Sequence, residues 1–527
     1  MSAFSLAAVF SDRCVLQRNK PVSVFGSGPD GMNVSVILRF PDGAEYRAAA
    51  GVSCGRWRAV LPPLRENGGG TLEVRCADES LVCTDVAVGE VWLCGGQSNM
   101  EFELQNCTSG PDHLKNDSPD VRFYYTQKKV MTEPDFFECE KKTAWALFSP
   151  ENAICWSAVG YIFGKKLSEK LGVTVGLIGC NWGATSASNW MPMDALGESE
   201  ETKPYLTDYL KRIEGISPEE QKRAYDEYVP RAEEWNRKYG ELLLKKPGMD
   251  WAEAERVLGK NPWPGPVNYF NPFRPGAMYE SMLKRVCPYT LRGFLYYQGE
   301  SDDFRPQSYY ALFKHMIRIW REIWRDDAPF LFVQLPGHRY ASDPDYKHWC
   351  LIREAQYKVS RAVEGTGMIC AIDAGEFNDI HPRDKEPIGD RLYKLALEKV
   401  YGLLGADEAE SPDIDRIVFK GGCARVQFKH TGGKLCAKGD GEITGFELAG
   451  EDGNYQPAQA ELSADGNSVL LRAPGIASPA YVRYLWTNYP ERVDLYGSNG
   501  LPALPFRTDG QETKPRCTGG IQQIMEL

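Results

Sequence analysis

The sequence lacks three features that would point to common classes of protein. No stretch of its 527 residues approaches the 18 or more apolar residues of a membrane-spanning helix. The 61 lysines and arginines form no dense run, and the formal net charge is −11, which excludes the clustered cations that bind phosphate. The opening residues, MSAFSLAAVFSDRC, do not join a basic start to a long apolar stretch, so we expect no signal peptide. We therefore expect a protein that binds neither nucleic acid nor a membrane.

Paired cysteines are absent too. None of the 15 cysteines falls in a Cys-x-x-Cys pair, which argues against a zinc knuckle or a thioredoxin-type redox site. Cys94, Cys180 and Cys370 lie inside apolar runs, a pattern typical of buried reduced thiols. This pattern favours a reducing compartment, and we expect a cytoplasmic protein.

The hydrophobic pattern divides the chain into three parts. Residues 1–88 contain short strand-like segments separated by turns, which predicts an N-terminal β-sandwich-like module. In residues 89–411 strand-like apolar runs alternate with amphipathic stretches, which predicts a parallel sheet inside a three-layer α/β/α sandwich. A charged helical segment and an aromatic loop interrupt this pattern at about 195–285, near the expected mouth of the site. Residues 412–527 return to β patterning and predict a second β-sandwich-like module.

Small and polar residues follow three of the predicted strands. They are the segments Gly95–Met100, Gly179–Thr185 and Tyr297–Asp302. Because parallel strands end at one edge of a sheet, these segments should converge there. A serine on such a tight turn, Ser98, would expose its hydroxyl as a nucleophile. A glycine N–H and the side-chain amide of Gln298 could donate to an oxyanion.

A serine nucleophile needs a general base, and the chain offers only six histidines: 113, 315, 338, 348, 381 and 430. His315 falls within a predicted helix and His430 in the trailing β region. His338 and His348 fall in a loop that could approach the same edge. His381 comes late in the α/β region, two residues after an acid, and is the best placed to take a proton from Ser98.

In combination these segments match one family. The chain resembles the sialate O-acetylesterases, within the SGNH or GDSL-like hydrolases, in four segments. They are GGQSNM (95–100), WGATSASNWMP (182–192), YYQGESD (296–302) and DIHPRDK (379–385). Each segment alone is common, but their order is specific. The resemblance implies an SGNH-hydrolase core for the α/β region.

The resemblance also implies the catalytic roles. Ser98 would be the nucleophile and His381 the base, and no metal or other cofactor would be needed. Gly183, Gln298 and the N–H of Ser98 would form the oxyanion hole.

The acidic residue that should orient the ring of His381 departs from the family pattern. SGNH hydrolases usually carry an aspartate three residues before the histidine, and that position is Asn378 here. Asp379 could act instead, Glu300 could supply the acid, or a backbone carbonyl could orient the ring of a Ser–His dyad. We favour Asp379.

The implied function is a serine esterase that removes O-acetyl groups from sugars, in the first place from sialic acids. Arg274 and Arg383 are candidates to meet the carboxylate of such a sugar, and Trp182 is a candidate sugar contact. An acetyl xylan or other polysaccharide acetylesterase is the alternative within the enzyme class. A non-catalytic carbohydrate-binding protein with a degenerate hydrolase core is the alternative outside it. The sequence leaves a homo-oligomer open.

Overall fold

The computed structural model describes residues 4–510, apart from residues 118, 247, 248, 250, 342, 343 and 440. The part of the predicted C-terminal module beyond residue 510 lies outside the described residues. The fold is mixed α/β, with a central sheet and several antiparallel sheets. No helix in the described part of the chain is both long and apolar enough to cross a membrane.

The central sheet follows the predicted alternation of strands and helices. Its strand order is β10-β9-β11-β8-β12-β13-β14, and the pairs from β9 to β14 are parallel. The strands are β8 (Glu79–Gly96), β9 (Val121–Tyr125), β10 (Ala146–Leu147), β11 (Val175–Asn181), β12 (Gly293–Tyr297), β13 (Phe330–Gln334) and β14 (Thr366–Cys370).

Helices pack on both faces of this sheet. On one face α5 (Ala158–Leu171) packs against α12 (Glu386–Lys399), and Phe163 of α5 lies edge-on to Trp92 of β8. On the other face α10 (Tyr309–Trp324) packs against α11 (His348–Ala362), and Trp320 lies over Gly95. Trp92 and Gly95 are three residues apart in β8 and so point to opposite faces. The shorter helices are α1 (Ser98–Glu101), α2 (Gly110–Asn116), α3 (Phe136–Glu140), α4 (Pro150–Ala153), α9 (Lys284–Val286) and α13 (Ala406–Ala409).

The N-terminal module is joined to the core through one continuous strand. The 18-residue β8 pairs with β7 in its first half and with β11 and β12 in its second half. The predicted boundary at residue 88 therefore falls inside a strand. The other strands of this module are β1 (Ser5–Leu6), β2 (Val15–Gln17), β3 (Val22–Ser27), β4 (Asn33–Arg39), β5 (Glu45–Gly51), β6 (Arg56–Leu61) and β7 (Asn67–Cys76).

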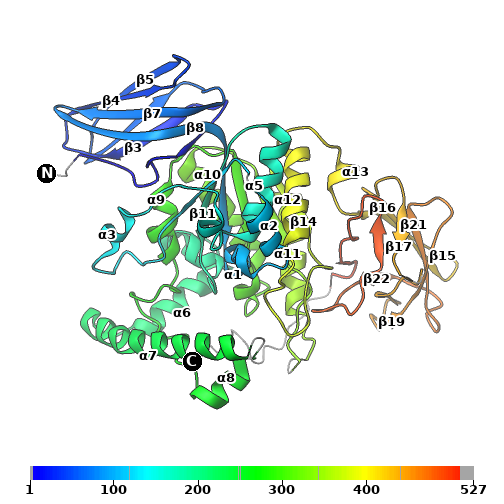
Figure 1. The fold of residues 1–527 in the computed structure, drawn as a ribbon. Coiled ribbons are helices and arrows are strands. Elements are labelled where there is room, and N and C mark those ends of the chain that lie inside the picture. Colours follow the sequence, from blue (N-terminus) through cyan, green and yellow to red (C-terminus); the bar gives the residue numbers. More distant parts are fainter. Residues whose placement is uncertain are drawn as a thin grey trace.

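The C-terminal module lies at the other end of the core from the N-terminal module (Figure 1). It has two four-stranded antiparallel sheets and one two-stranded sheet, around a second hydrophobic cluster. The strands are β15 (Asp413–Lys420), β16 (Cys423–Lys429), β17 (Leu435–Ala437), β18 (Phe446–Ala449), β19 (Gln456–Pro457), β20 (Gln459–Leu462), β21 (Ser468–Arg472), β22 (Tyr481–Tyr484), β23 (Leu495–Gly497) and β24 (Phe506–Arg507).

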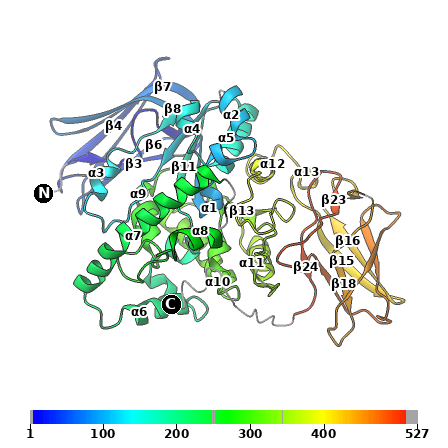
Figure 2. The same cartoon turned by 60° about the horizontal axis from the view of Figure 1, so that its bottom comes forward.

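The segment predicted as an insertion, at about 195–285, contains three of the longer stretches of helix in the described chain. They are α6 (Lys203–Ile213), α7 (Pro218–Lys245) and α8 (Trp251–Leu258), which lie below the core in Figure 1 and come forward in Figure 2. The aromatic loop after α8 is fastened to α7, because Asn268 donates to the backbone carbonyl of Gln221 and Phe270 stacks on Tyr225.

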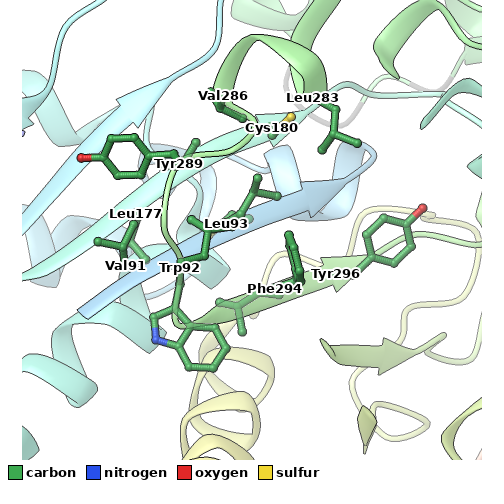
Figure 3. Packing of buried hydrophobic residues seen from close by; sticks show 14 of the residues in the cluster. Val91, Trp92, Leu93, Leu177, Cys180, Leu283, Val286, Tyr289, Phe294 and Tyr296 are labelled. Atoms are coloured by element: carbon green, nitrogen blue, oxygen red, sulfur yellow. The ribbon is translucent and has the colours of Figure 1, made fainter. Parts of the chain in front are cut away.

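The main hydrophobic cluster fills the space between the central sheet and its helices. Figure 3 shows Val91, Trp92 and Leu93 of β8 beside Leu177 of β11 and Phe294 of β12. All five are fully buried. The strands that carry the candidate site therefore rest on a packed and rigid base.

Candidate active site

The turn that carries Ser98 is held by the ends of three parallel strands. β8 ends at Gly96, which has a φ of 134°, and a Cβ there would lie 2.2 Å from the carbonyl oxygen of Tyr297. Only glycine fits such a position. The N–H of Gln97 donates to Tyr297 in β12 at 3.1 Å, and the N–H of Trp182, after β11, donates to Gly96 at 3.1 Å. The chain then turns at once into α1, which begins at Ser98.

Ser98 and His381 meet at this edge of the sheet. The Nε2 atom of His381 lies 2.8 Å from the Oγ atom of Ser98. That distance suits donation from the hydroxyl to a neutral imidazole. Burial lowers the pKa of His381, the charge of Lys385 lowers it further, and Asp379 opposes both. The ring is therefore held in the neutral form that accepts a proton.

Neither of the two candidate acids, Asp379 and Glu300, bonds the Nδ1 atom of the imidazole. The carboxylate of Asp379 accepts the backbone N–H of His381 at 2.9 Å, and Asn378 accepts the N–H of Ala341 at 3.0 Å. Glu300 is bonded to Asn99 instead. Among the described residues, Nδ1 of His381 has no hydrogen-bond partner. Asp379 thus holds the backbone of His381 rather than its ring.

A buried polar network joins the serine turn to the histidine loop. Asn99, directly after Ser98, donates to Glu300 at 2.7 Å and to the carbonyl of Ile380 at 3.0 Å. Lys385 donates to the side-chain oxygen of Asn99 at 2.6 Å. Burial raises the pKa of Glu300 and lowers the pKa of Lys385 to about 8. Because Ile380 precedes His381, this network fixes the spacing between the side chains of Ser98 and His381.

Two backbone N–H groups flank the serine. A Cβ on Gly183 would lie 3.3 Å from the Cβ of Ser98, so the two residues are in contact. The N–H of Gly183 donates to a carboxylate oxygen of Glu101 at 2.7 Å, and Glu101 also pairs with Lys128. The N–H of Ser98 has no partner among the described residues. A carboxylate oxygen of Glu101 therefore occupies the N–H of Gly183, the residue in contact with Ser98.

The side chain of Gln298 is engaged elsewhere. Its amide nitrogen donates to the carbonyl of Thr185 at 3.1 Å and to Asp302 at 2.6 Å, and its oxygen accepts from Tyr309. Both amide hydrogens are used, so the donation to an oxyanion expected for Gln298 is absent from this arrangement. Asp302 also accepts from Ser186, and Gln298 thus helps to hold the loop that follows Gly183.

The residues expected to contact the sugar are scattered. Arg274 is buried and donates to the carbonyls of Tyr269 and Pro275 and to the carboxylate of Glu280, so it is not free for a substrate. Arg383 is exposed, and Trp182 is half-buried beside Gly183.

Sequence reasoning assigned no role to Asn99, Glu101, Lys385 or Asp302. Asn99, Lys385 and Asp302 lie inside the matched segments, and that was the only signal for them. Among the described residues, no group of three or more His, Cys, Asp or Glu could hold a metal ion.

Comparisons with known proteins agree on one kind of enzyme. The model of the family "Carbohydrate esterase, sialic acid-specific acetylesterase" matches residues 266–387, which include Gln298 and His381. The sialate O-acetylesterases of Mus musculus and Homo sapiens are each 24% identical to the chain. Those matches cover 95% of this chain, 94% of the mouse protein and 92% of the human one.

A solved structure extends the agreement to the fold. The crystal structure of a carbohydrate acetylesterase from Xanthomonas citri superposes with a TM-score of 0.74 at 28% identity. The match covers 96% of this chain and 100% of that one.

Together these matches define the chain as a carboxylic ester hydrolase, a carbohydrate esterase. Within that class, residues 266–387 match the sialic acid-specific acetylesterase family, and the chain is similar to sialate O-acetylesterases over 95% of its length.

Proposed function

We propose that this esterase removes acetyl groups from the hydroxyls of sialic acids, through an acetyl-enzyme on Ser98. The observation that carries the proposal is the 2.8 Å contact between Ser98 Oγ and His381 Nε2 at the carboxyl edge of the parallel sheet. The names of the mouse and human relatives supply the sugar. The core that holds this pair is proposed to be a three-layer α/β/α SGNH-hydrolase domain between two β-sandwich-like modules.

The first half of the reaction forms the acetyl-enzyme. Ser98 Oγ attacks the acetyl carbonyl carbon while His381 Nε2 takes its proton. The tetrahedral oxyanion accepts hydrogen bonds from the N–H groups of Ser98 and Gly183. When the intermediate collapses, the sugar oxygen leaves and takes the proton from His381. Water then attacks the acetyl-enzyme with His381 again as the base, and acetate leaves.

The substrate must displace one side chain before this chemistry starts. Glu101 holds the N–H of Gly183, and about 30% of the Glu101 side chain is exposed. It can therefore turn toward Lys128 when the substrate carbonyl takes its place. Gln298, the third expected donor, would first have to leave Thr185 or Asp302. The proposal therefore rests on the two backbone donors.

Asp379 is proposed to support His381 from behind. Its carboxylate holds the backbone N–H of the histidine, and its negative charge stabilises the imidazolium that forms during the reaction. The pair Ser98–His381 then works as a dyad whose spacing is set by the Asn99–Glu300–Lys385 network.

A second candidate is an acetylesterase that acts on a neutral polysaccharide such as xylan. It is favoured by the broader description of the Xanthomonas citri protein as a carbohydrate acetylesterase. Release of acetate from O-acetylated sialic acid and from acetyl xylan, measured side by side, distinguishes the two.

Replacement of Ser98 by alanine tests the shared chemistry. We expect kcat on 4-nitrophenyl acetate to fall by roughly 10⁴-fold or more, because the nucleophile is lost, while the thermal midpoint stays near that of the wild type. A fluorophosphonate probe should label the wild type and not Ser98→Ala.

Ser360→Ala is the matched control. Among the described residues, the Ser360 hydroxyl bonds only within α11, to the carbonyl of Tyr357, so this variant should keep full activity. Substantial activity in Ser98→Ala would contradict the proposal.

A further inference from the structure

A cavity lies between the insertion and the loop that begins directly after Gly183. It has a volume of about 80 Å³, and its walls come from the loop after Gly183, from α6 and from the aromatic loop that follows α8. Ala184, which directly follows Gly183, lines it, and so does Ser301, whose N–H donates to the side chain of Gln97. The floor of the cavity is therefore fixed to the turn that carries Ser98.

The cavity wall carries more positive than negative side chains, unlike the chain as a whole. The wall contains three arginines and one aspartate, although the whole chain has a net charge of −11. Arg305 pairs with Asp208, and Arg274 pairs with Glu280. Arg212 of α6 has no ion-pair or hydrogen-bond partner among the described residues. One half-buried guanidinium in the wall is thus left for a ligand.

The rest of the wall suits a sugar ring. Trp263, Phe273 and Phe304 offer apolar ring surfaces, which pack against the C–H faces of a pyranose. The hydroxyl of Tyr209 has no hydrogen-bond partner among the described residues and can meet a sugar hydroxyl.

We propose that this cavity is a subsite for the carboxylate-bearing part of an acidic sugar, with Arg212 as the residue that binds the carboxylate. A guanidinium pairs with a planar carboxylate through two parallel N–H···O bonds, which no neutral sugar can match. The proposal rests on the proposed esterase function, because it names a part of the substrate away from the acetyl group. It assigns specificity to the insertion, while the acyl chemistry stays at the sheet edge.

Direct binding tests the subsite without catalysis. The probes are N-acetylneuraminic acid, its methyl ester and xylobiose, titrated by calorimetry or saturation-transfer NMR against the full chain. We expect the wild type to bind the free acid better than the ester or xylobiose. Arg212→Gln should weaken binding of the acid by roughly 10- to 100-fold, the range for a charge-assisted hydrogen bond, and leave the ester unchanged.

The matched control is Lys211→Gln, which removes the same charge from the next residue of α6, an exposed side chain outside the cavity wall. It should bind the acid like the wild type. Equal binding of the acid by Arg212→Gln and the wild type would overturn the proposal, and so would a wild type that prefers the ester or xylobiose.

Kinetics separate this inference from the proposed function. Arg212→Gln should lower kcat/KM for an O-acetylated sialic acid and leave kcat/KM for 4-nitrophenyl acetate unchanged, because the small ester does not need the subsite. Equal losses of kcat/KM on both substrates would also contradict the proposed subsite. Activity retained by Ser98→Ala would instead overturn the catalytic assignment, whatever Arg212 does.

Discussion

The imidazole ring of His381, the proposed base, is held in place mostly by the loop around it. Its Nε2 meets Ser98, while its other nitrogen has no partner among the described residues. The ring keeps its place because the loop around it is fixed, through Asp379 to its own N–H and through Asn99 to the carbonyl of Ile380. The charges of Lys385 and Asp379 act on its pKa in opposite directions.

This balance predicts a pH profile. Since the neutral ring is the base and its pKa is lowered, kcat/KM for 4-nitrophenyl acetate should rise with pH through one ionisation below the ordinary histidine value of about 6.5. Asp379→Asn removes the charge that raises this pKa, so the rising limb should move to lower pH. The loss in kcat should stay well under the roughly 10⁴-fold that follows when an acid bonded to the ring is changed.

Asp384→Asn is the control for this measurement, because Asp384 is exposed in the same loop and bonds only the N–H of Glu386. The rising limb of the pH profile of Asp384→Asn should coincide with that of the wild type. A loss near 10⁴-fold would show that Asp379 acts on the ring itself, and a limb that moves to higher pH would contradict the role given to its charge.

Among the elements, α2, α5 and α12 are clamped together by one histidine. His113 of α2 lies 2.6 Å from Asp117 and 3.0 Å from Glu386 at the start of α12, and Tyr161 of α5 also donates to Asp117. The hydrogen bond to Glu386 raises the pKa of His113, burial opposes this, and Asp117 adds to the rise.

The raised pKa makes the clamp sensitive to pH. Its contribution to stability is fully present below the unfolded value of about 6.5 and is lost as the pH rises through the higher folded value. We therefore expect the difference in thermal midpoint between wild type and His113→Gln to shrink from pH 6 to pH 8.5. His315→Gln is the control, because burial lowers the pKa of that residue. A difference in thermal midpoint that grows with pH would contradict the stabilising role of the charged His113.

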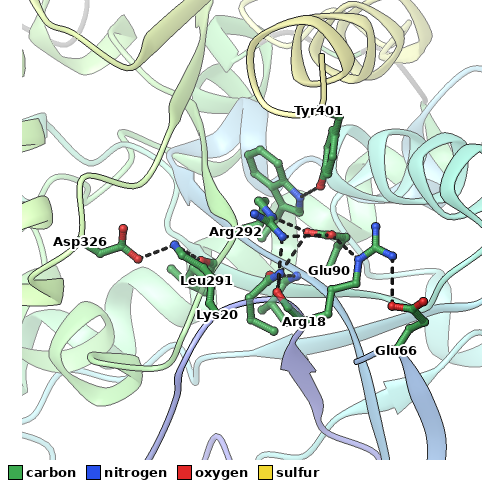
Figure 4. Close-up of polar contacts among 11 residues, drawn as sticks. Arg18, Lys20, Glu66, Glu90, Leu291, Arg292, Asp326 and Tyr401 are labelled. Atoms are coloured by element: carbon green, nitrogen blue, oxygen red, sulfur yellow. Dashed lines mark hydrogen bonds and ion pairs between the residues drawn. The ribbon is translucent and has the colours of Figure 1, made fainter. Parts of the chain in front are cut away.

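At the scale of the whole molecule, the N-terminal module and the core share a buried ion cluster. Glu90 of β8 is fully buried and accepts from Arg18 at 2.6 Å and from Arg292 at 2.7 Å (Figure 4). Arg18 belongs to the N-terminal module, and Arg292 directly precedes β12. Nearby, Lys20 donates to Asp326 and to the carbonyl of Leu291.

Breaking this cluster should destabilise both parts together. Glu90→Gln keeps the shape of the side chain but leaves Arg292 without its negative partner and Arg18 with only its longer pair to Glu66. We therefore expect the free energy of unfolding to fall by about 3–5 kcal/mol. Urea unfolding followed by circular dichroism measures it. Glu45→Gln, on an exposed surface pair, should change little. If Glu90→Gln lowers the free energy of unfolding equally little, the ion cluster does not hold the N-terminal module and the core together.

Local pattern determined much of the fold. The alternation of apolar runs and amphipathic stretches predicted β8, α5, β11, β12, α10 and the elements up to α12, because strand and helix periods are properties of short segments. It missed β9, a strand of only five residues, VRFYY, with an arginine inside it. It also placed a boundary at residue 88, within β8, because a change of pattern does not show that one strand continues through it.

The sequence by itself determined which segments carry reactive groups, since the strand ends and their glycines can be read locally. Only the tertiary structure decided what each group touches. Ser98 and His381 are 283 residues apart and meet through the order of the strands. The same long-range packing turned Gln298 toward Asp302, gave Asp379 the backbone of His381, and placed Arg212 in the wall of a cavity that Ala184 and Ser301 also line. Partners of polar groups follow from distances across the folded chain, and no local period encodes those distances.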